Sequence, residues 1–439
     1  MDSLWTNTAG MPAFPALSGD LKTDVLIIGG GLTGLLCAHL FDQAGVPYAL
    51  IEADRIMRGV SACTTAKITV QHRLIYEKLL RTRGEEAAQR YREANENALA
   101  QYRALCAEID CAFEEKDAYV YDRERTDRLE KECAAMARAG LHADFVDRLN
   151  LPFPVAGAIR LRGQAQFHPL QFAASIAQGL HIYEQTAALA WDGQTVETRG
   201  GRIRAERIVV ATHFPIFNRH GAYFLKLYQH RSYVLALRGA QDVQGMYVDA
   251  QETGLSFRNS GDLLLLGGGA HRTGKRGGGY DALRADAKAL YPNARVACQW
   301  ATQDCMSLDD LPYIGQYAPS TPRLYVATGF CKWGMTLSMA AAQILRDLLL
   351  GKGSPYAPLF SPSRSMLRPQ LLVNGLEATM HLLTPTRPRC PHMGCALKWN
   401  PQERTWDCPC HGSRFSGEGG LITGPATGRL RKTPPMPDA

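Results

Sequence analysis

Two short segments near the C-terminus are rich in cysteine and histidine, and their chemistry requires them to meet in space. The first reads C-P-H-M-G-C over residues 390–395 and the second reads C-P-C-H-G-S over residues 408–413, with twelve residues between them. Each supplies one cysteine and one histidine: Cys390 with His392, and Cys408 with His411. A [2Fe–2S] cluster with two thiolates on one iron and two imidazoles on the other needs two such pairs on facing loops. The spacing therefore predicts two loops that converge on one cluster.

These segments resemble the cluster-binding loops of Rieske proteins, which implies that Cys390, His392, Cys408 and His411 are the ligands. In the Rieske proteins that the chain resembles, the remaining two cysteines form a disulfide, so the resemblance implies a Cys395–Cys410 bond. Ser413 is placed to donate a hydrogen bond to the cluster. Phe415 stands where high-potential Rieske proteins of respiratory complexes carry a tyrosine, so we expect a lower reduction potential here.

A structural zinc site is the alternative interpretation of this region. Mixed cysteine and histidine ligands at short spacings also bind Zn²⁺. Zinc modules rarely combine C-x-H with C-P-C-H-G-S, which favours the cluster. Iron and acid-labile sulfide analysis separates the two.

A second motif lies near the N-terminus, where an apolar strand over residues 24–28 runs into a glycine-rich turn. Gly29, Gly31 and Gly34 have G-x-G-x-x-G spacing, a helix is expected over 32–44, and an apolar strand over 48–51 ends at Glu52, 23 residues after the first glycine. The glycines let the backbone approach a pyrophosphate, the helix N-terminus stabilises its charge, and the acid accepts hydrogen bonds from ribose hydroxyls. The alternative is a glycine-rich turn without a ligand.

The choice of FAD over NAD rests on resemblance. From about residue 21 to 350 the chain is similar to the FAD-dependent amine oxidoreductases of the D-amino-acid oxidase, glycine oxidase and sarcosine oxidase superfamily. The matching segments are 59–67 (G-V-S-A-C-T-T-A-K), 208–212 (I-V-V-A-T) and 324–336. The resemblance implies that the last segment places a helix N-terminus by the flavin, where a positive dipole stabilises the reduced form. The turn and the resemblance together give the expected FAD contacts: Gly29, Gly31, Leu32, Thr33, Gly34, Glu52, Ala53, Thr64, Thr65, Ala66, Lys67, Ala211, Thr212, Gly329, Gly334, Met335 and Thr336.

Three residues are candidates for catalysis or substrate selection: Lys332, Asp304 and His271. Lys332 lies in the last matching segment, where it could supply charge near the flavin or face solvent. Asp304 stands where amino-acid oxidases of this superfamily place an arginine for the substrate carboxylate. A carboxylate does not pair with a carboxylate, which favours a cationic amine, although Asp304 could equally cap a turn. Cys63 stands where related dehydrogenases bind flavin covalently through histidine; a thioether and simple core packing are both open.

Changes in pattern along the chain predict its domain organisation. Region 1–352 is expected to hold FAD-binding segments at about 21–70, 160–220 and 300–352, a helical insertion at about 72–145, and an antiparallel substrate-binding sheet at about 222–299. A Pro- and Ser-rich linker, 353–365, leads to a Rieske domain, 366–439. The predicted fold class is α/β: a Rossmann-type FAD-binding domain with an antiparallel-sheet substrate domain, followed by a small all-β Rieske domain.

Composition excludes several classes of function. The chain has 439 residues, 46% of them hydrophobic, and its net charge of +7 has no dense basic stretch with interleaved aromatic residues, which argues against nucleic-acid binding. The N-terminus lacks a basic and apolar leader, and no stretch is long enough for a membrane span, so we expect a cytoplasmic protein. Four of the twelve cysteines belong to the cluster motif, and the other eight are scattered, which implies no oxidising compartment.

The two motifs together predict an enzyme that oxidises a small-molecule amine by hydride transfer to FAD and passes single electrons through the cluster to an external acceptor. One alternative is an NAD(P)H-driven reductase, but its only second nucleotide motif, residues 267–274, has Arg272 where a glycine is needed. Another alternative is a redox sensor or electron-transfer module without substrate turnover.

Overall fold

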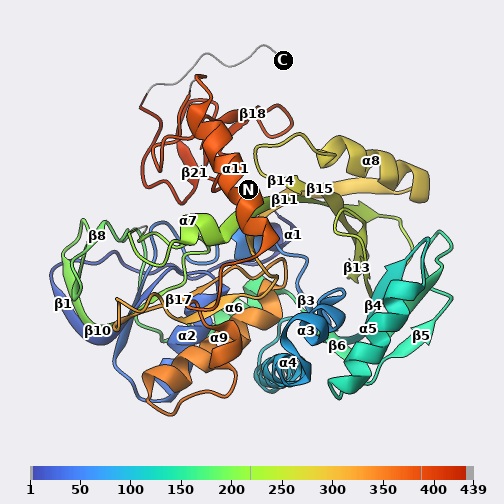
Figure 1. Ribbon diagram of the computed structural model, residues 1–439, viewed down its shortest axis with the longest axis horizontal. Coiled ribbons are helices and arrows are strands. Elements are labelled where there is room, and N and C mark those ends of the chain that lie inside the picture. The colour runs from blue at the N-terminus through green and yellow to red at the C-terminus, as the bar shows by residue number, and fades with distance from the viewer. Residues whose placement is uncertain (1–2, 218, 387, 432–439) are drawn as a thin grey trace.

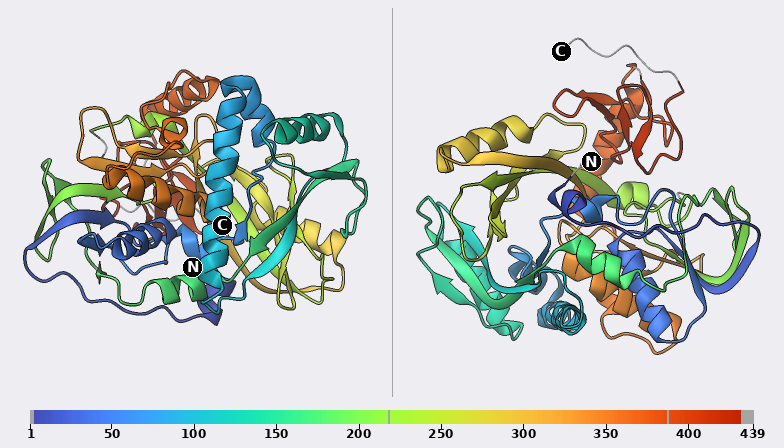
Figure 2. Two further views of the ribbon diagram at one scale, coloured as in Figure 1. Left: turned by 90° about the horizontal axis from the view of Figure 1, so that it is seen from below. Right: turned by 180° about the vertical axis from the view of Figure 1, so that it is seen from behind.

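The structure of the protein, a computed structural model, describes residues 3–217, 219–386 and 388–431. Within these residues the strands form three sheets: a mainly parallel sheet, a large mixed sheet, and a small antiparallel sheet at the C-terminal end. The small sheet and its helix stand above the other two sheets in Figure 1, and the view from behind in Figure 2 shows the same stacking. The predicted fold class is confirmed.

The parallel sheet is built around β1 (Leu21–Ile28), whose last four residues are all buried. Such an apolar run is typical of a parallel strand covered on both faces. The strands lie in the order β16 (Tyr313–Gln316), β17 (Leu324–Thr328), β10 (Arg202–Val210), β1, β2 (Tyr48–Ile51) and β7 (Ile182–Tyr183), with β9 (Thr195–Glu197) and β8 (Ala190–Trp191) attached to β10. Helices α2 (Leu32–Gln43) and α9 (Gly334–Leu349) pack side by side on one face, near α6 (Pro169–Ile176) (Figure 1).

The mixed sheet has an inner face toward the parallel sheet and an outer face. On β11 (Leu227–Arg238), Val234 and Ala236 join the core shared with the parallel sheet, whereas Tyr233 and Leu235 pack with α8 (Gly279–Leu290) on the outer face. Successive residues of one strand thus serve opposite faces. The strand order is β15 (Arg295–Ser307), β11, β14 (Leu263–Arg272), β13 (Ser256–Ser260), β12 (Met246–Asp249), β4 (Glu114–Asp122), β6 (Gly157–Gln166) and β3 (Lys67–Ile68), with β5 (Asp144–Val146) on β6.

The region expected as a helical insertion is only partly helical. It contains α3 (Ile75–Arg83), α4 (Glu85–Cys106) and α5 (Asp127–Arg138), but β4 and β5 lie within it and belong to the mixed sheet. Alternation of buried and more exposed residues, which is typical of a strand, occurs only in the second half of β4, where Ala118 and Val120 are buried. The first half is charged and shows no such alternation. Two short helices, α1 (Leu4–Thr8) and α7 (Tyr223–Lys226), lie outside this region.

The segment expected as a linker is fixed to the rest of the protein. It contains α10 (Ala357–Phe360), Phe360 is fully buried, and Arg364 donates to the two carboxylate oxygens of Asp309 at 2.8 and 2.9 Å. The helix α11 (Pro369–Leu383) and the strands β18 (Lys398–Asn400), β19 (Thr405–Asp407), β20 (Arg414–Ser416) and β21 (Leu421–Thr423) follow. Residues 432–439 of the predicted Rieske domain lie outside the described residues, and the domain boundaries stay a prediction. None of the helices described is both long and apolar enough to cross a bilayer.

Candidate functional site

The glycine-rich turn between β1 and α2 is closed to side chains. A Cβ on Gly34 would overlap the carbonyl oxygen of Gly29, and a Cβ on Gly29 would lie 2.7 Å from the carbonyl oxygen of Ala211 at the end of β10. Glu52, just after β2, accepts a hydrogen bond from the Gly30 amide at 2.7 Å, and burial raises the pKa of this carboxyl. This close packing leaves the start of α2 as a cradle that fits the pyrophosphate of FAD.

The predicted FAD contacts gather around this cradle, at the C-terminal ends of the parallel strands. They lie at the start of α2 (Gly29, Gly31, Leu32, Thr33, Gly34), after β2 (Glu52, Ala53), before and within β3 (Thr64, Thr65, Ala66, Lys67), after β10 (Ala211, Thr212), and after β17 into α9 (Gly329, Gly334, Met335, Thr336). Thr33 of α2 is 2.8 Å from the Ser338 hydroxyl of α9, and the hydroxyl of Thr336 donates to the carbonyl of Thr69 at 2.9 Å. Their contact with FAD stays a prediction.

The loop that leads from the 3-10 helix η1 (Val60–Cys63) into β3 is held by three distant side chains whose contacts with this loop the sequence does not predict. Trp5 donates its indole N–H to the carbonyl of Thr64 at 2.7 Å, Trp300 donates to that of Cys63 at 3.0 Å, and Arg258 donates to that of Ala66 at 2.9 Å. Ser61 similarly accepts from the Leu32 amide at 3.0 Å. No local pattern marks these residues, because their partners are remote in the sequence.

Two ionisable groups on these loops have perturbed pKa values. Burial and the nearby guanidinium of Arg258 lower the pKa of Lys67 to about 7. Burial raises the pKa of Cys63 to about 11, so this thiol stays protonated near neutral pH, which favours core packing over a thioether.

The loop that opens α9 is strained. Cys331 and Lys332 have φ values of 51° and 75°, a left-handed conformation that costs side-chain-bearing residues about 1–3 kcal/mol each. The Cys331 amide donates to the carbonyl of Cys305 on β15 at 3.0 Å, which helps to hold this shape. Burial and the positive charge of Arg73 lower the pKa of Lys332. Lys332 is thus a partly buried cation beside the expected flavin position rather than a solvent-facing residue.

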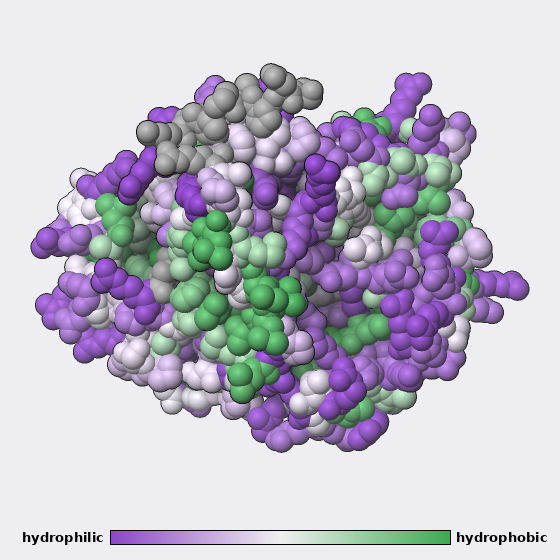
Figure 3. All heavy atoms as spheres, turned by 45° about the horizontal axis from the view of Figure 1, so that its top comes forward, coloured by the Kyte–Doolittle hydropathy of each residue, from purple (hydrophilic) through white to green (hydrophobic). Residues whose placement is uncertain are grey.

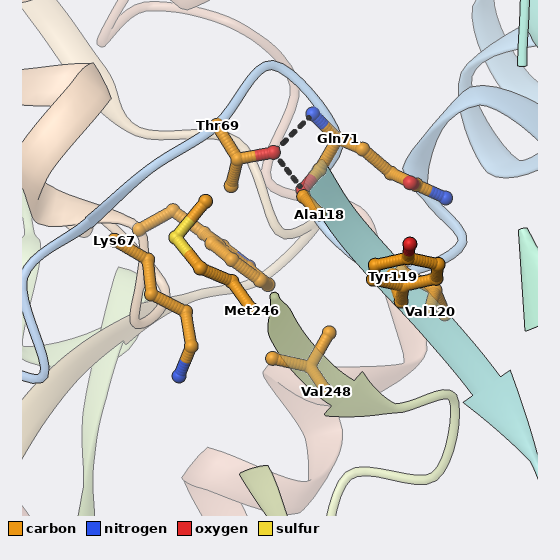
Figure 4. Close-up of a pocket in the computed structure, with 9 residues that line it drawn as sticks. Lys67, Thr69, Gln71, Ala118, Tyr119, Val120, Met246 and Val248 are labelled. Carbon is orange, nitrogen blue, oxygen red and sulfur yellow. Dashed lines mark hydrogen bonds between the residues drawn. The ribbon is translucent and has the colours of Figure 1, made fainter. Parts of the chain in front are cut away.

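A pocket opens between β3, β4, β12 and the start of α9 (Figure 4). Lys67 and Trp333 from the predicted flavin loops meet Tyr119 and Met246 of the mixed sheet there. Gln71, which also lines the pocket, is buried, and both polar atoms of its side-chain amide lack a hydrogen-bond partner in the structure. Such an amide in a pocket is suited to a polar ligand group. No local sequence pattern marks Gln71.

The three candidate catalytic residues fall on two faces of the mixed sheet. Asp304 of β15 lies directly opposite His230 of β11, both on the inner face, and accepts from the Ser232 hydroxyl at 3.4 Å. Asp304 also acts electrostatically on Lys332, so these two residues share one neighbourhood. His271 instead lies opposite Arg231 on the outer face and contacts the Tyr233 hydroxyl at 3.0 Å. The structure therefore brings Asp304 and Lys332 together and places His271 apart from them.

The predicted cluster ligands converge in the C-terminal domain. Cys390 and Cys408 are buried with their thiols in hydrogen-bonding contact, and the rings of His392 and His411 have centroids 5.0 Å apart. Both ring nitrogens of His392 and Nδ1 of His411 are buried without a hydrogen-bond partner. Two thiols and two imidazoles with free nitrogens fit a [2Fe–2S] centre with mixed ligands. The assignment of each ligand stays a prediction.

The neighbours of these ligands bear on the other predictions for this region. Ser413 makes a side-chain hydrogen bond to Cys390, consistent with its expected role toward the cluster, and Phe415 is fully buried. Cys395 and Cys410 are free thiols in the structure, with sulfur atoms within 4.8 Å of each other and of Cys408. Their disulfide stays a prediction.

The C-terminal domain docks on the outer face of the mixed sheet through a buried ionic network. Arg231, only 1% exposed, pairs with Glu403, and the Tyr233 hydroxyl donates to Glu403 at 3.1 Å. Arg414, also 1% exposed, donates to Glu403 at 2.8 Å and to Asp407 at 2.9 Å. Burial raises the pKa of Glu403, but the two guanidinium groups outweigh it and lower the pKa overall.

A second set of contacts joins the cluster loops to the flavin region. Nε2 of His411 lies 3.0 Å from the carbonyl oxygen of Phe224, and Gln303 donates its side-chain amide to the carbonyl of Gly412 at 2.7 Å. The ring of Phe214 lies 6.2 Å from that of His392 and 5.9 Å from that of His411, centroid to centroid. Phe214 is only two residues beyond Thr212, one of the predicted FAD contacts.

Comparison with known proteins agrees with both halves of this arrangement. Residues 24–348 match the FAD dependent oxidoreductase family, and residues 377–434 match the Rieske [2Fe-2S] domain. The Rieske 2Fe-2S iron-sulfur protein YhfW of Bacillus subtilis (strain 168) is 34% identical over 98% of this chain and 97% of its own length.

Solved structures resemble the flavin region in fold. Glycine oxidase from Geobacillus kaustophilus superposes with a TM-score of 0.65 at 21% identity, over 79% of this chain and 100% of that protein. L-proline dehydrogenase from P. horikoshii gives a TM-score of 0.65 at 16% identity, over 80% of this chain and 98% of that protein.

Proposed function

The chain belongs to the family of FAD dependent oxidoreductases and carries a C-terminal Rieske [2Fe-2S] domain, and from this premise we propose that it oxidises a small cationic amine and passes the electrons to an external acceptor. When bound, FAD supplies a two-electron acceptor for the substrate hydride, and the [2Fe–2S] cluster supplies a one-electron carrier. The named neighbours glycine oxidase and L-proline dehydrogenase support a substrate with a C–N bond.

The observation that carries the proposal is that one sheet bears residues of both sites. Asp304 and His230 lie on its inner face, near Lys332 and the FAD cradle, and Arg231 and Gln303 on its outer face hold the cluster domain. This arrangement supports transfer of electrons within one chain, because Phe214 contacts the rings of both cluster histidines and Ala211, three residues earlier, packs against Gly29 of the cradle.

The residues of the inner face suit a positively charged substrate. The Asp304 carboxylate offers an acceptor for an ammonium group at a position where an arginine would bind a carboxylate. Lys332, whose pKa is lowered, and Gln71, whose amide is unpartnered, could hold a polar group farther from the amine. The apolar wall of the pocket, which includes the buried Met246 and the half-buried Trp333, would exclude water from the reacting carbon.

The proposed oxidation removes one proton and one hydride from the amine. The bound ammonium would first pass a proton from its nitrogen to the Asp304 carboxylate. The neutral amine then loses a hydride from the carbon next to nitrogen to FAD and becomes an iminium ion, which water hydrolyses outside the pocket. Two electrons leave the substrate as a pair and must leave the protein one at a time, which is why a one-electron carrier is useful. We propose a cytoplasmic location and an acceptor that is a separate protein or small molecule.

Anaerobic reduction tests the proposal. Holoprotein mixed with a panel of mono-, di- and polyamines should lose the flavin absorption near its visible maximum and then develop the electron paramagnetic resonance signal of a reduced cluster. Flavin bleaching by NADH but by no amine would overturn it in favour of a reductase. Residues 267–274 argue against that reading, because they lie largely within strand β14 and not in a strand-to-helix turn. A cluster that reduces reversibly with no substrate turnover at all would indicate a redox sensor.

A further inference from the structure

The helix α11 turns its polar face toward the protein and its apolar face outward. The side chains it turns toward the protein are polar: Asn374, Glu377 and His381 are 4%, 9% and 7% exposed. The side chains it turns outward are apolar: Leu372, Leu376, Met380 and Leu383 are 72%, 67%, 59% and 77% exposed. A surface helix of a globular protein normally does the opposite.

Specific contacts fix this orientation. Asn374 donates its side-chain amide to the carbonyl of Leu225 at 3.2 Å, and Lys275 donates to the Glu377 carboxylate. His381 Nε2 lies 3.6 Å from Glu377, and the carbonyl of His381 accepts from the Ala396 amide at 2.9 Å. Rotation of α11 to bury its leucines would break every one of these interactions. The apolar face is therefore directed outward by the fold.

The outward residues of α11 form a concentrated apolar patch. Of the thirteen large hydrophobic side chains exposed among the described residues, seven lie between residues 367 and 383. Figure 3 shows hydrophobic residues gathered in one continuous area over the position of α11. Patches of this kind mark interaction sites in proteins that fold normally. The members of this α11 patch are Leu367, Leu372, Val373, Leu376, Met380, Leu382 and Leu383.

The sequence around the α11 patch is strongly basic. Between residues 352 and 398 there are six cationic residues and a single acid, Glu377. Arg364 is buried against Asp309, and Arg387 lies outside the described residues. The described cations that flank the patch are Arg368 at the N-cap of α11, Arg389, which donates to the carbonyl of Leu382 at 3.1 Å, and the exposed Lys398, which acts electrostatically on His381. A partner that is complementary to this surface must be apolar where it meets the leucines and negative around them. The cations are Lys352, Arg364, Arg368, Arg387, Arg389 and Lys398.

We propose that α11 seats the protein on the surface of a lipid bilayer that contains anionic lipids. Its 15 residues are fewer than the roughly 20 needed to cross a bilayer, so the helix would lie in the plane of the interface with its leucines among the acyl chains. The basic flanks would meet the lipid phosphates. A second copy of the chain is less suitable, because a two-fold contact would bring the same basic flanks against each other.

Vesicle binding by the full-length holoprotein tests this. Wild type should float with vesicles of phosphatidylcholine and phosphatidylglycerol, bind less to phosphatidylcholine alone, and lose part of its binding at high salt. Leu372→Gln/Leu376→Gln should reduce the bound fraction on the order of tenfold or more, because two large apolar side chains no longer enter the bilayer. The matched control Leu189→Gln changes a leucine that is 55% exposed elsewhere and should bind as wild type does.

Two further readouts complete the test. Leu376→Trp should be quenched by brominated lipids, whereas the native tryptophans alone should show little quenching. Flavin and cluster absorption and the melting temperature of each variant should match wild type, which shows that only the surface has changed. Three results would overturn the proposal: no binding of wild type to either vesicle, equal binding of wild type and the double variant, or a dimer that the double variant abolishes without any vesicle binding.

Discussion

Gly34 illustrates, at the scale of a residue, how the FAD cradle depends on the absence of a side chain. A Cβ there would overlap the carbonyl oxygen of Gly29, which is backbone and cannot move aside. We expect Gly34→Ala to abolish FAD binding, measured as the ratio of visible to ultraviolet absorption of the purified protein. Gly10→Ala is the control, because no atom lies within 4 Å of a Cβ at Gly10 and its φ is outside the left-handed region. Normal FAD content in Gly34→Ala would contradict the assignment of the cradle.

Asp304 is the residue on which the proposed substrate charge depends. We expect Asp304→Asn to lower kcat/KM for a cationic amine by roughly tenfold or more, because a charge-assisted hydrogen bond is worth about 1.5–3 kcal/mol. Steady-state assays across the amine panel measure this effect. Asp262→Asn, which removes an acid that is 63% exposed, should leave kcat/KM unchanged. Equal kcat/KM for wild type and Asp304→Asn would assign Asp304 to a structural role at the end of β15.

At the scale of elements, the start of α3 is capped from another helix. Leu74, at the N-cap, provides no side-chain hydrogen bond, and Glu132 of α5 accepts instead from the amides of Tyr76 at 2.9 Å and Glu77 at 2.7 Å. Burial raises the pKa of Glu132 from 4.5 to about 7. The folded protein therefore holds this proton to a higher pH than the unfolded chain does.

A pH dependence of stability follows from that shift. Between about pH 4.5 and pH 7 the folded state binds more protons at Glu132 than the unfolded state, so rising pH lowers the free energy of unfolding, by about 3 kcal/mol across the window. Glu132→Gln should remove this contribution. Urea unfolding at several pH values should therefore show a difference between wild type and variant that changes across this window. A difference that is constant with pH would contradict the prediction.

The elements also show which parts of the fold could be read from the sequence. The glycine turn, α2 and the strands β1 and β2 were predicted closely, because a parallel strand, a tight turn and a helix each leave a local pattern. The strand β4 was missed within the supposed helical insertion, because only Ala118 and Val120 show alternation and its partner β12 lies more than a hundred residues later. The composition of the predicted linker gives no sign of its anchor, the pairing of Arg364 with Asp309, because that contact joins residues 55 positions apart.

In the candidate site, too, features with a local sequence pattern could be predicted, whereas features that depend on distant residues could not. The candidate cluster ligands and the glycines of the cradle can be predicted from the sequence, because each set occupies one or two short segments, and their contacts with the cofactors stay a prediction. Gln71, Trp5 and Glu403 were not predicted, because each acts on a residue that only the tertiary fold brings near. His271 was grouped with Asp304 and Lys332 in sequence reasoning, but the strand period of two puts its side chain on the outer face.

At the scale of the whole molecule, Glu403 joins the two cofactor domains. It pairs with Arg231 of β11 and Arg414 of the Rieske domain, and both guanidinium groups are almost fully buried. We expect Glu403→Ala to destabilise the docked state by about 3–5 kcal/mol, because it leaves buried positive charge without its partner. Limited proteolysis should then cut residues 353–389 faster than in wild type, and the cluster domain should unfold separately.

A matched surface variant controls for the loss of an ion pair as such. Asp262 pairs with Arg238 where both side chains are 63% exposed, so Asp262→Ala should change the free energy of unfolding by less than about 1 kcal/mol. A Glu403→Ala protein that resists proteolysis as wild type does, and melts in one transition, would show that other contacts are enough to hold the domains together.

The alternation of side chains along β11 has a consequence for how such an enzyme can change over time. Neighbouring residues of this strand have different roles, since His230 lies beside Asp304 of the proposed substrate site and Arg231 pairs with Glu403 of the Rieske domain. Substitutions at every second position of β11 can therefore alter the proposed substrate site, while the residues between them keep their contacts with the Rieske domain. Because side chains alternate along one strand, natural selection can change the proposed substrate specificity without changing how the Rieske domain docks.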